Sequence, residues 1–132
     1  MPKVSIVVLN WNGINFLKSC LKSLGKLTYK SLEIIIVDNG STDGSQKFIK
    51  ENYPKFNLIE NNKNYGFAEG NNIGIRASRG KYVLLLNNDT MANPNFLGSL
   101  VEDCEKDEKI GCIQPQIRLL NEKNLLDEAG AY

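Results

Sequence analysis

The sequence contains no histidine, so Ser-His-Asp catalysis, Cys-His catalysis and histidine-ligated metal sites are excluded. Its three cysteines, Cys20, Cys104 and Cys112, form no C-x-x-C pair, which argues against a disulfide framework and against a zinc site. No apolar run approaches the ~18 residues that a membrane-spanning helix needs, and the apolar segment near the N-terminus is too short for a signal peptide. These absences predict a cytoplasmic protein without a transmembrane segment, and they leave room for peripheral association of the full protein with the inner face of the membrane.

The sequence also lacks an excess of charge of either sign. Sixteen basic and fifteen acidic side chains leave a formal net charge of +1. Such a balanced chain produces no long-range field that would favour a phosphate backbone, so nucleic acid is not an expected partner. With 132 residues, of which 42% are hydrophobic, the chain is long enough for one compact domain and too short for two. We therefore interpret residues 1–132 as a single domain.

Short apolar runs alternate with helical patterns along the chain. Strands are expected at Val4–Leu9, Leu32–Val37, Phe56–Ile59 and Tyr82–Leu86, with a fifth at Ile110–Pro115. These runs are rich in Val, Ile and Leu, which is typical of strands covered on both faces. Helices are expected at Phe16–Leu24, Gly44–Asn52, Ala68–Ser78 and Asn93–Lys106. The alternation predicts an α/β fold, a three-layer α/β/α sandwich with a mainly parallel sheet.

Three details of these helices are also predicted. Phe16 follows the helical spacing of the apolar residues in the first helix, so it is expected on the buried face. Asp43, followed three residues later by Gln46, is the pattern of a capping box, in which two side chains bond to the backbone N–H groups of a helix start. Pro94 fits the first turn of the last helix, where its missing N–H is not needed.

Polar clusters follow four of the expected strands: NWNG, DNGSTDGS, NNKNYG and NNDT. Because the carboxyl ends of parallel strands meet at one edge of a sheet, where open α/β folds bind ligands, we expect these clusters to form one site. The common nucleotide signatures G-x-G-x-x-G and G-x-x-x-x-G-K-[ST] are both absent. Asn10 and Asn12 do not supply the paired acids that a flavodoxin-like receiver domain needs.

The residues alone leave two interpretations of each cluster. Asp38 either belongs to a strand, turn and cap without a ligand, or accepts the N3–H of uracil or thymine or the N1–H of guanine. The segment 64–72 is either a polar loop with a loosely packed helix, or a helix start whose backbone N–H groups bind an anion. Asp89 either caps the next helix or, with neighbouring amide oxygens, suits Mg²⁺ or Mn²⁺, hard cations that prefer oxygen ligands. Capping is the weaker interpretation, because Pro94 indicates that the next helix starts several residues later.

The segments VSIVVLNWNG, IIIVDNGSTDGS, NYGFAEGNNIGI and YVLLLNNDT, in this order and spacing, resemble the family 2 inverting glycosyltransferases of GT-A fold. The resemblance covers essentially the whole chain, and the branch with rhamnosyltransferases and galactofuranosyltransferases looks most similar. It implies a nucleotide-diphospho-sugar transferase, of which this chain is the N-terminal, donor-binding portion, truncated before the acceptor-binding half.

The resemblance also implies roles for residues at matching positions. The end of the first strand lines the nucleoside pocket, Asp38 contacts the base, and the third cluster runs near the diphosphate. The nucleotide-sugar-binding residues implied in this way are Leu9, Asn10, Asn12, Asp38, Asn64, Gly66, Gly70, Asn71, Asn87 and Asn88. The Asp-x-Asp metal motif falls on Asn87-Asn88-Asp89, so Asp89 is the implied ligand of Mg²⁺ or Mn²⁺, with Asn87 nearer the ribose.

In this motif the first acid is replaced by Asn87, which leaves one carboxylate. A carboxylate ~4 Å from a divalent ion supplies at most ~8 kcal/mol of attraction at an effective dielectric constant of ~20, before desolvation. Losing the second acid therefore weakens the binding of free metal, and we expect the metal to arrive with the nucleotide diphosphate.

The implied activity is transfer of a sugar from a UDP- or dTDP-linked donor to a saccharide or lipid-linked saccharide acceptor, in the synthesis of cell-surface polysaccharide. A single displacement inverts the anomeric carbon, and a carboxylate base accepts the acceptor's proton. In the family this base lies in the acceptor-binding half, here beyond Tyr132, so the isolated chain is expected to turn over poorly. The alternatives are a non-catalytic nucleotide-sugar-binding or interaction module of the same fold, and a generic flavodoxin-like signalling domain.

Overall fold

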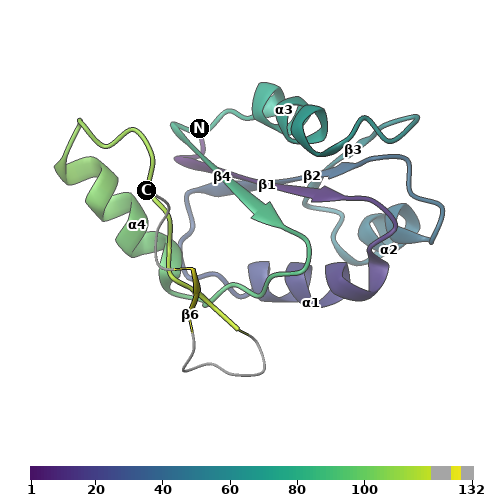
Figure 1. The fold of residues 1–132 in the computed structure, drawn as a ribbon, viewed down its shortest axis with the longest axis horizontal. Coiled ribbons are helices and arrows are strands. Elements are labelled where there is room, and N and C mark those ends of the chain that lie inside the picture. The colour runs from purple at the N-terminus through teal and green to yellow at the C-terminus, as the bar shows by residue number, and fades with distance from the viewer. Residues whose placement is uncertain (120–125, 129–132) are drawn as a thin grey trace.

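The computed structural model describes residues 1–119 and 126–128, which form a four-stranded sheet with helices on both faces and a separate two-stranded sheet (Figure 1). In chain order the elements are β1 (Val4–Asn10), α1 (Ile14–Leu24), β2 (Leu32–Asp38), α2 (Ser45–Asn52), β3 (Asn57–Glu60), α3 (Phe67–Ala77), β4 (Tyr82–Asn87), α4 (Phe96–Lys106), β5 (Ile117–Arg118) and β6 (Leu126–Glu128).

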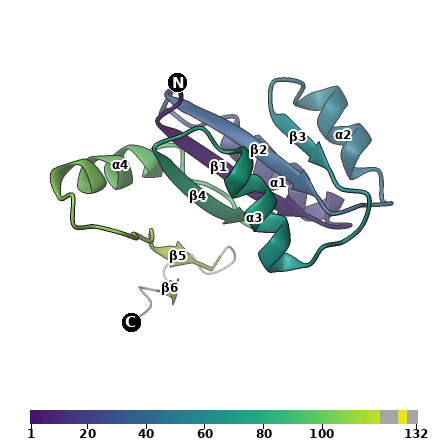
Figure 2. The same ribbon diagram turned by 90° about the horizontal axis from the view of Figure 1, so that it is seen from above.

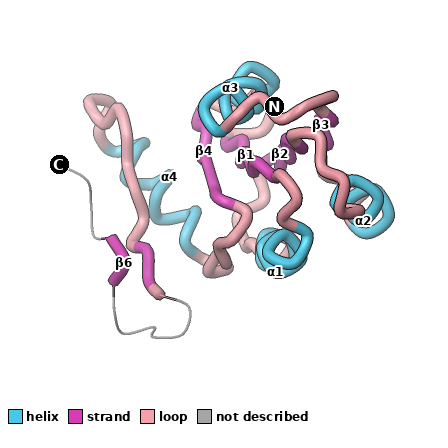
Figure 3. Tube along the Cα trace, turned by 45° about the vertical axis from the view of Figure 1, so that its right-hand side comes forward, coloured by secondary structure: helices cyan, strands magenta, loops and turns pink. Residues whose placement is uncertain are grey.

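All strands of the main sheet are parallel, in the order β3-β2-β1-β4. β1 is central and pairs with β2 from Val4↔Leu32 to Asn10↔Asp38. α1 and α2 lie on one face of the sheet and α3 on the other, as Figures 1 and 3 show. The strands point the same way, so their carboxyl ends gather at one end of the sheet (Figure 2). The predicted α/β sandwich with a parallel sheet is confirmed.

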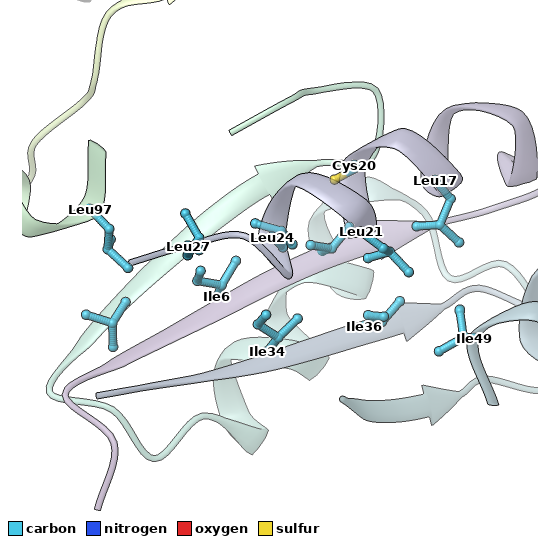
Figure 4. Close-up of a cluster of buried hydrophobic side chains, with 12 residues drawn as sticks. Ile6, Leu17, Cys20, Leu21, Leu24, Leu27, Ile34, Ile36, Ile49 and Leu97 are labelled. Atoms are coloured by element: carbon cyan, nitrogen blue, oxygen red, sulfur yellow. The ribbon is translucent and has the colours of Figure 1, made fainter. Parts of the chain in front are cut away.

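The hydrophobic core has one part on each face of the sheet, because successive side chains of a strand point to opposite faces. Ile6 of β1 packs with α1, whereas the next residue, Val7, packs on the α3 side. Burial of such an aliphatic side chain contributes about 1.5–3 kcal/mol. The larger cluster, on the α1 face, is drawn in Figure 4 and comprises Val4, Ile6, Val8, Leu17, Cys20, Leu21, Leu24, Leu27, Ile34, Ile36, Ile49 and Leu97.

α3 packs on the sheet through Gly74, where a methyl group has no room. A Cβ built at Gly74 would lie 2.3 Å from Val7 Cγ1 and 3.1 Å from Val37 Cγ2. We expect Gly74→Ala to lower the free energy of unfolding by about 1–3 kcal/mol, because the helix must move away from the sheet. Urea unfolding followed by circular dichroism measures this change.

Gly98 of α4 provides the matched control for Gly74. Nothing lies within 4 Å of a Cβ built at Gly98. Gly98→Ala should therefore raise the free energy of unfolding by about 0.5–1 kcal/mol, since alanine favours a helix over glycine. Equal shifts in the two variants would contradict the close packing of α3 on the sheet.

The prediction that the strand at Tyr82–Leu86 is buried on both faces is wrong. β4 is the last strand of the four-stranded sheet in the described part of the chain, and only one of its faces packs on the core. Leu84 and Leu86 lie half-buried against that core, whereas Val83 and Leu85 are 41% and 49% exposed. The difference arises because α3 packs on β1 and β2, so it leaves the same face of β4 exposed.

The prediction of a fifth strand at Ile110–Pro115 is also wrong. This segment is irregular, and the strand β5 begins only at Ile117 and pairs antiparallel with β6, outside the main sheet. Pro115 has no backbone N–H to donate to a strand ladder, which makes it a poor strand residue.

Two details of the helices differ from expectation. Phe16 is 62% exposed rather than buried, because it lies at the side of α1 and not among Leu17, Leu21 and their neighbours. α4 begins at Phe96, so Pro94 lies in the turn before the helix rather than in its first turn.

None of the helices in the described residues has both the length and the hydropathy needed to cross a membrane.

The predicted capping box at Asp43 and Gln46 does not form. Asp43 Oδ1 accepts a hydrogen bond from the backbone N of Ser45 at 3.0 Å, as a cap would. Gln46, however, donates from Nε2 to Asp38 Oδ1 at 2.8 Å instead of bonding back to the backbone at residue 43. The buried carboxylate of Asp38 competes for this side chain, because an acceptor buried without donors would carry a large desolvation penalty.

Candidate functional site

The polar clusters that follow the strands meet at the carboxyl end of the main sheet. A pocket of about 270 Å³ opens there, lined by the ends of β1 and β4 and the start of α3. The pocket is lined by Leu9, Trp11, Asn39, Asn64, Gly66, Phe67, Asn87 and Asn88. The structure thus brings together five of the predicted site residues: Leu9, Asn64, Gly66, Asn87 and Asn88. A larger groove of about 390 Å³ runs between β4 and α4, but its lining is mainly apolar and lies away from these clusters.

Two exposed aromatic residues of the pocket were not predicted from the sequence. Trp11 is 55% exposed and Phe67 is 69% exposed, and both line the pocket. Exposed aromatic rings beside a pocket provide flat apolar faces on which a planar ligand can stack. The position of Trp11 between Asn10 and Asn12, beyond the end of a buried strand, was the signal in the sequence that could have indicated it.

Asp38 and Asn10 lie beneath the pocket in a buried hydrogen-bond network, and neither is exposed. Asn10 Nδ2 donates to Asp38 Oδ2 at 3.0 Å, and Asn88 Nδ2 donates to Asn10 Oδ1 at 2.9 Å. Asp38 Oδ1 accepts from Ser41 N and Gln46 Nε2, both at 2.8 Å. The network therefore ties the ends of three strands together and holds Asn88 at the pocket. A direct contact between Asp38 and a base remains a prediction, and it requires one of these donors to move.

The loop after β1 is anchored to the loop after β2. Asn12 has a positive φ of 49°, and its Oδ1 accepts a hydrogen bond from Thr42 N at 2.7 Å. Its neighbour Gly13 sits so close to the network that a Cβ there would lie 2.3 Å from Asn88 Nδ2. Asn12 therefore connects two loops and does not line the pocket.

Asp43 strengthens the same connection, because its Oδ2 accepts a hydrogen bond from Ile14 N at 2.9 Å. Burial of the Asp43 carboxylate on its own would raise its pKa, but the hydrogen bonds from Ser45 and Ile14 outweigh this effect and lower the pKa below its usual value. The carboxylate is therefore held ionised where the first helical turns of α1 and α2 meet.

The turn before α3 is shaped by Asn39 and Asn64. Asn39 Nδ2 donates to Gly66 O at 3.1 Å, and Gly66 N donates to Asn64 Oδ1 at 2.8 Å. Gly66 has a φ of +86°, a conformation that favours glycine, and this places the start of α3 at the pocket.

Gly70 and Asn71, predicted near the diphosphate, point inward in this structure. A Cβ at Gly70 would lie 2.5 Å from Leu9 Cδ1, and Asn71 is buried with its Nδ2 donating to Phe67 O at 3.1 Å. Both residues hold α3 in place behind the pocket, so their predicted contact with a diphosphate remains untested.

Asp89 lies on the loop that leaves β4, and its side chain is exposed. The preceding backbone is fixed at the carbonyl oxygen of Asn87, which accepts from Thr90 Oγ1 at 2.7 Å and from Cys20 Sγ at 3.8 Å. Burial raises the pKa of the Cys20 thiol to about 11, so this thiol stays protonated and acts as a donor.

The oxygen atoms available at this loop suit a hard divalent cation whose remaining ligands are phosphate oxygens and water. No group of three or more Asp, Glu, Cys or His residues that could hold an ion by themselves occurs in the described residues. One exposed carboxylate with nearby amides is what a Mg²⁺ or Mn²⁺ ion needs when phosphate oxygens and water complete its shell. Asp89 is the residue that would hold it.

The chain belongs to the glycosyl transferase family 2, whose sequence profile it matches over residues 5–126. It is 30% identical over 125 residues to an uncharacterized glycosyltransferase of Haemophilus influenzae. This alignment covers 92% of this chain and 39% of that protein. It is 29% identical over 130 residues to a chondroitin synthase of Escherichia coli. This second alignment covers 96% of this chain and 19% of the synthase.

The fold is shared with a mannosyltransferase, PcManGT from Pyrobaculum calidifontis, solved in complex with GDP-Man and Mn²⁺. The TM-score is 0.76 at 24% identity, and the match covers 86% of this chain and 36% of the mannosyltransferase. The chain therefore spans about two fifths or less of the length of these three proteins.

Proposed function

We propose that this chain binds the nucleotide-diphosphate sugar donor of a glycosyltransferase, with a UDP- or dTDP-linked sugar as the donor class. The observation that carries the proposal is the pocket at the carboxyl end of the sheet. There, exposed aromatic rings, the start of α3 and the loop with Asp89 converge. Membership of the glycosyl transferase family 2 supports the same assignment.

The nucleoside would lie against Trp11, because an exposed indole ring provides a face on which a base can stack. Stacking of a base on an aromatic side chain contributes about 1–3 kcal/mol. Phe67 offers a second ring on the same pocket, and Leu9 provides an apolar floor. Asn64 is exposed, and its amide is oriented by the hydrogen bond that its Oδ1 accepts from Gly66 N, so it is available as a fixed polar group. Asn39 is buried and engaged with Gly66 and Asn61, so it supports the pocket from behind.

The diphosphate would lie between the start of α3 and the loop at Asp89. The first N–H groups of a helix have no partners within the helix and carry a partial positive charge, which favours an anion. Asp89 would hold Mg²⁺ or Mn²⁺, which when bound neutralises charge on the departing diphosphate. Asn88, fixed by Asn10, keeps the loop beside the pocket.

The proposed reaction is a single displacement that inverts the anomeric carbon. The acceptor hydroxyl oxygen forms the new bond to that carbon, the bond from the carbon to the phosphate oxygen breaks, and a carboxylate base receives the hydroxyl proton. We place this base beyond Tyr132, in an acceptor-binding half, and the donor branch near rhamnosyl- and galactofuranosyltransferases. The acceptor would be a growing cell-surface saccharide, which the likeness to a chondroitin synthase supports.

Isothermal titration calorimetry on the chain tests the donor assignment. UDP, dTDP and GDP are titrated with and without Mn²⁺, and the thermal melt of the sample is recorded first to establish that it is folded. We expect UDP or dTDP to bind at least about 100-fold more tightly in the presence of Mn²⁺, a difference of ~2.7 kcal/mol. A folded sample that binds none of the three would refute the proposal, and a preference for GDP would correct the donor class.

A further inference from the structure

Trp11 lies in the loop after β1, between two residues whose backbones are fixed. The carbonyl oxygen of Asn10 accepts a hydrogen bond from Asn39 N at 2.8 Å. On the other side, Asn12 N donates to Ser41 Oγ at 2.9 Å. Because a peptide unit is planar, a residue between two fixed peptide units has little freedom left in its φ and ψ angles. The direction in which the Trp11 side chain leaves the backbone is therefore set by the loop after β2.

Asn12 holds this loop in a conformation that residues other than glycine seldom adopt. Its φ is 49°, and within the described residues no other residue besides glycine has a positive φ. Asparagine tolerates this region better than most residues do, yet the conformation persists only where the surroundings hold it. Here Asn12 Oδ1 accepts hydrogen bonds from Thr42 N at 2.7 Å and from Thr42 Oγ1 at 3.5 Å. A strained residue held in this way beside a pocket points to a function for the loop.

Asp43 anchors the far end of the same loop. Its Oδ2 accepts a hydrogen bond from Ile14 N at 2.9 Å, and its Oδ1 accepts one from Ser45 N at 3.0 Å. The loop that carries Trp11 is thus attached along its length to the loop after β2. We call the four residues that make these attachments the loop clasp: Asn12, Ser41, Thr42 and Asp43.

The loop clasp supports the pocket from outside. Trp11 is among the residues that line the pocket, whereas in the described part of the chain no residue of the loop clasp is. Asn12 and Thr42 are exposed and belong to neither part of the hydrophobic core. Such links bury little apolar surface, so their main effect is local: they fix the loop that carries the ring.

We propose that Asn12, through the loop clasp, is a positioning residue that presets the Trp11 ring for stacking on the base of the donor. This role rests on the proposed donor function and adds the residue that makes its aromatic face rigid. A ring that is fixed before the ligand arrives does not have to be ordered on binding, and such pre-organisation increases affinity. Stacking of a base on one aromatic ring is worth roughly five- to 150-fold in affinity, so a loosened ring should cost about tenfold.

The loop clasp should act on the base of the donor and not on the metal. Asp89 lies on the loop after β4, whose backbone is fixed separately, at Asn87 O, by Thr90 and Cys20. Loss of the clasp should therefore weaken nucleotide binding equally with and without Mn²⁺. Loss of the Asp89 carboxylate should weaken it only with Mn²⁺.

Time-resolved fluorescence anisotropy of Trp11 tests the loop clasp without any ligand. Trp11 is the single tryptophan, so the decay reports on this loop alone. In the wild-type chain we expect the ring to move mainly with the whole molecule. Asn12→Ala, which removes the acceptor Oδ1 and disfavours a positive φ, should add a fast local component to the decay. Ser41→Ala, which removes the acceptor of Asn12 N, should do the same from the opposite loop.

Calorimetry with UDP and dTDP then connects the motion of the ring to affinity. Asn12→Ala should bind the tighter of the two nucleotides about tenfold more weakly than wild type, both with and without Mn²⁺. The increase in affinity on adding Mn²⁺ should stay that of wild type. Asp89→Ala should show the opposite result, with this increase lost and the anisotropy of Trp11 unchanged. Thermal melts show that the variants are folded.

Asn12→Asp is the conservative variant, because aspartate keeps Oδ1 as an acceptor and also tolerates a positive φ. It should restore the wild-type anisotropy. Only the anisotropy is compared for this variant, since its added negative charge also affects the binding of a diphosphate.

Asn57→Ala is the matched control for Asn12→Ala. Asn57 is exposed, begins β3 at the other end of the sheet, and donates from its Nδ2 to Glu33 Oε2 at 3.4 Å. The variant thus removes the same kind of side chain and a hydrogen bond away from the pocket. It should change neither the anisotropy of Trp11 nor the affinity for the nucleotide.

Three results would overturn the proposal. One is a wild-type anisotropy in both Asn12→Ala and Ser41→Ala, which would show that the clasp does not hold the ring. Another is a mobile ring in Asn12→Ala together with an unchanged nucleotide affinity. The third is an equal effect of Asn57→Ala, which would show only a general loosening of the fold. A folded wild-type chain that binds no nucleotide refutes the donor assignment instead, and the anisotropy then decides whether the clasp holds Trp11.

Discussion

Asp89→Ala should lower the affinity for a nucleoside diphosphate in the presence of Mn²⁺ by at least about 100-fold, or ~2.7 kcal/mol. Asp89 carries the single carboxylate of the motif Asn87-Asn88-Asp89, so no second acid at that motif replaces it. The estimate is well below the ~8 kcal/mol upper limit of the Coulomb attraction, because the carboxylate and the ion both lose water on binding. Calorimetry measures the affinity with and without the metal.

The same titration separates the metal contact from a general effect on the pocket. In the absence of metal, wild type and Asp89→Ala should bind the nucleotide with similar affinity, because Asp89 is exposed and not part of the buried network. Asp103→Ala, which removes an exposed acid from α4, is the control and should leave both affinities unchanged. If Asp89→Ala retains the full increase in affinity on adding Mn²⁺, the assignment of Asp89 as the metal ligand is wrong.

Asp38→Ala should lower the free energy of unfolding by about 3 kcal/mol or more. The carboxylate is fully buried and accepts hydrogen bonds from Asn10, Ser41 and Gln46. Removal of the acceptor leaves these donors unsatisfied away from water, and each buried unsatisfied group carries a penalty of about 1–3 kcal/mol. Chemical denaturation followed by circular dichroism measures the loss.

Asp38→Asn is the control that keeps the shape of the side chain. Its one remaining carbonyl oxygen can still accept from Ser41 and Gln46, but its new NH2 group faces the donor Asn10 Nδ2. We therefore expect a loss of about 1–3 kcal/mol, smaller than that of alanine. Donor binding in Asp38→Asn then reports on the network without unfolding it. An Asp38→Ala variant as stable as wild type would show that the network does not hold the strand ends together.

The architecture could be predicted from the sequence because it depends on patterns that are local. Apolar runs of Val, Ile and Leu, separated by segments with helical periodicity, identify β1 and β2. These are the two inner strands of the sheet. β4 has a similar run, yet its burial depends on what lies beside it in the sheet. Only the arrangement of strands shows that Val83 and Leu85 face solvent. The same holds for Ile110–Pro115, whose apolar residues resemble a strand that does not form.

The candidate site was predicted in its location and only partly in its geometry. The sequence indicates that polar clusters meet at one edge of the sheet, and they do. It does not distinguish side chains that line the pocket, such as Asn64 and Asn87, from side chains buried behind it, such as Asn10 and Asp38. That distinction depends on rotamers and on competition for donors, as the capture of Gln46 by Asp38 shows.

Trp11 offers the most direct measurement of the central claim, that the pocket at the carboxyl end of the sheet binds a nucleotide-diphosphate donor. Trp11 is the chain's single tryptophan and lines that pocket, so its fluorescence reports on the site alone. We predict that UDP or dTDP with Mn²⁺ quenches the emission in a saturable way, and that Asp89→Ala shifts the curve to at least about 100-fold higher concentration. A folded chain that binds the nucleotide by calorimetry while Trp11 emission stays constant, or that binds none, would contradict the account.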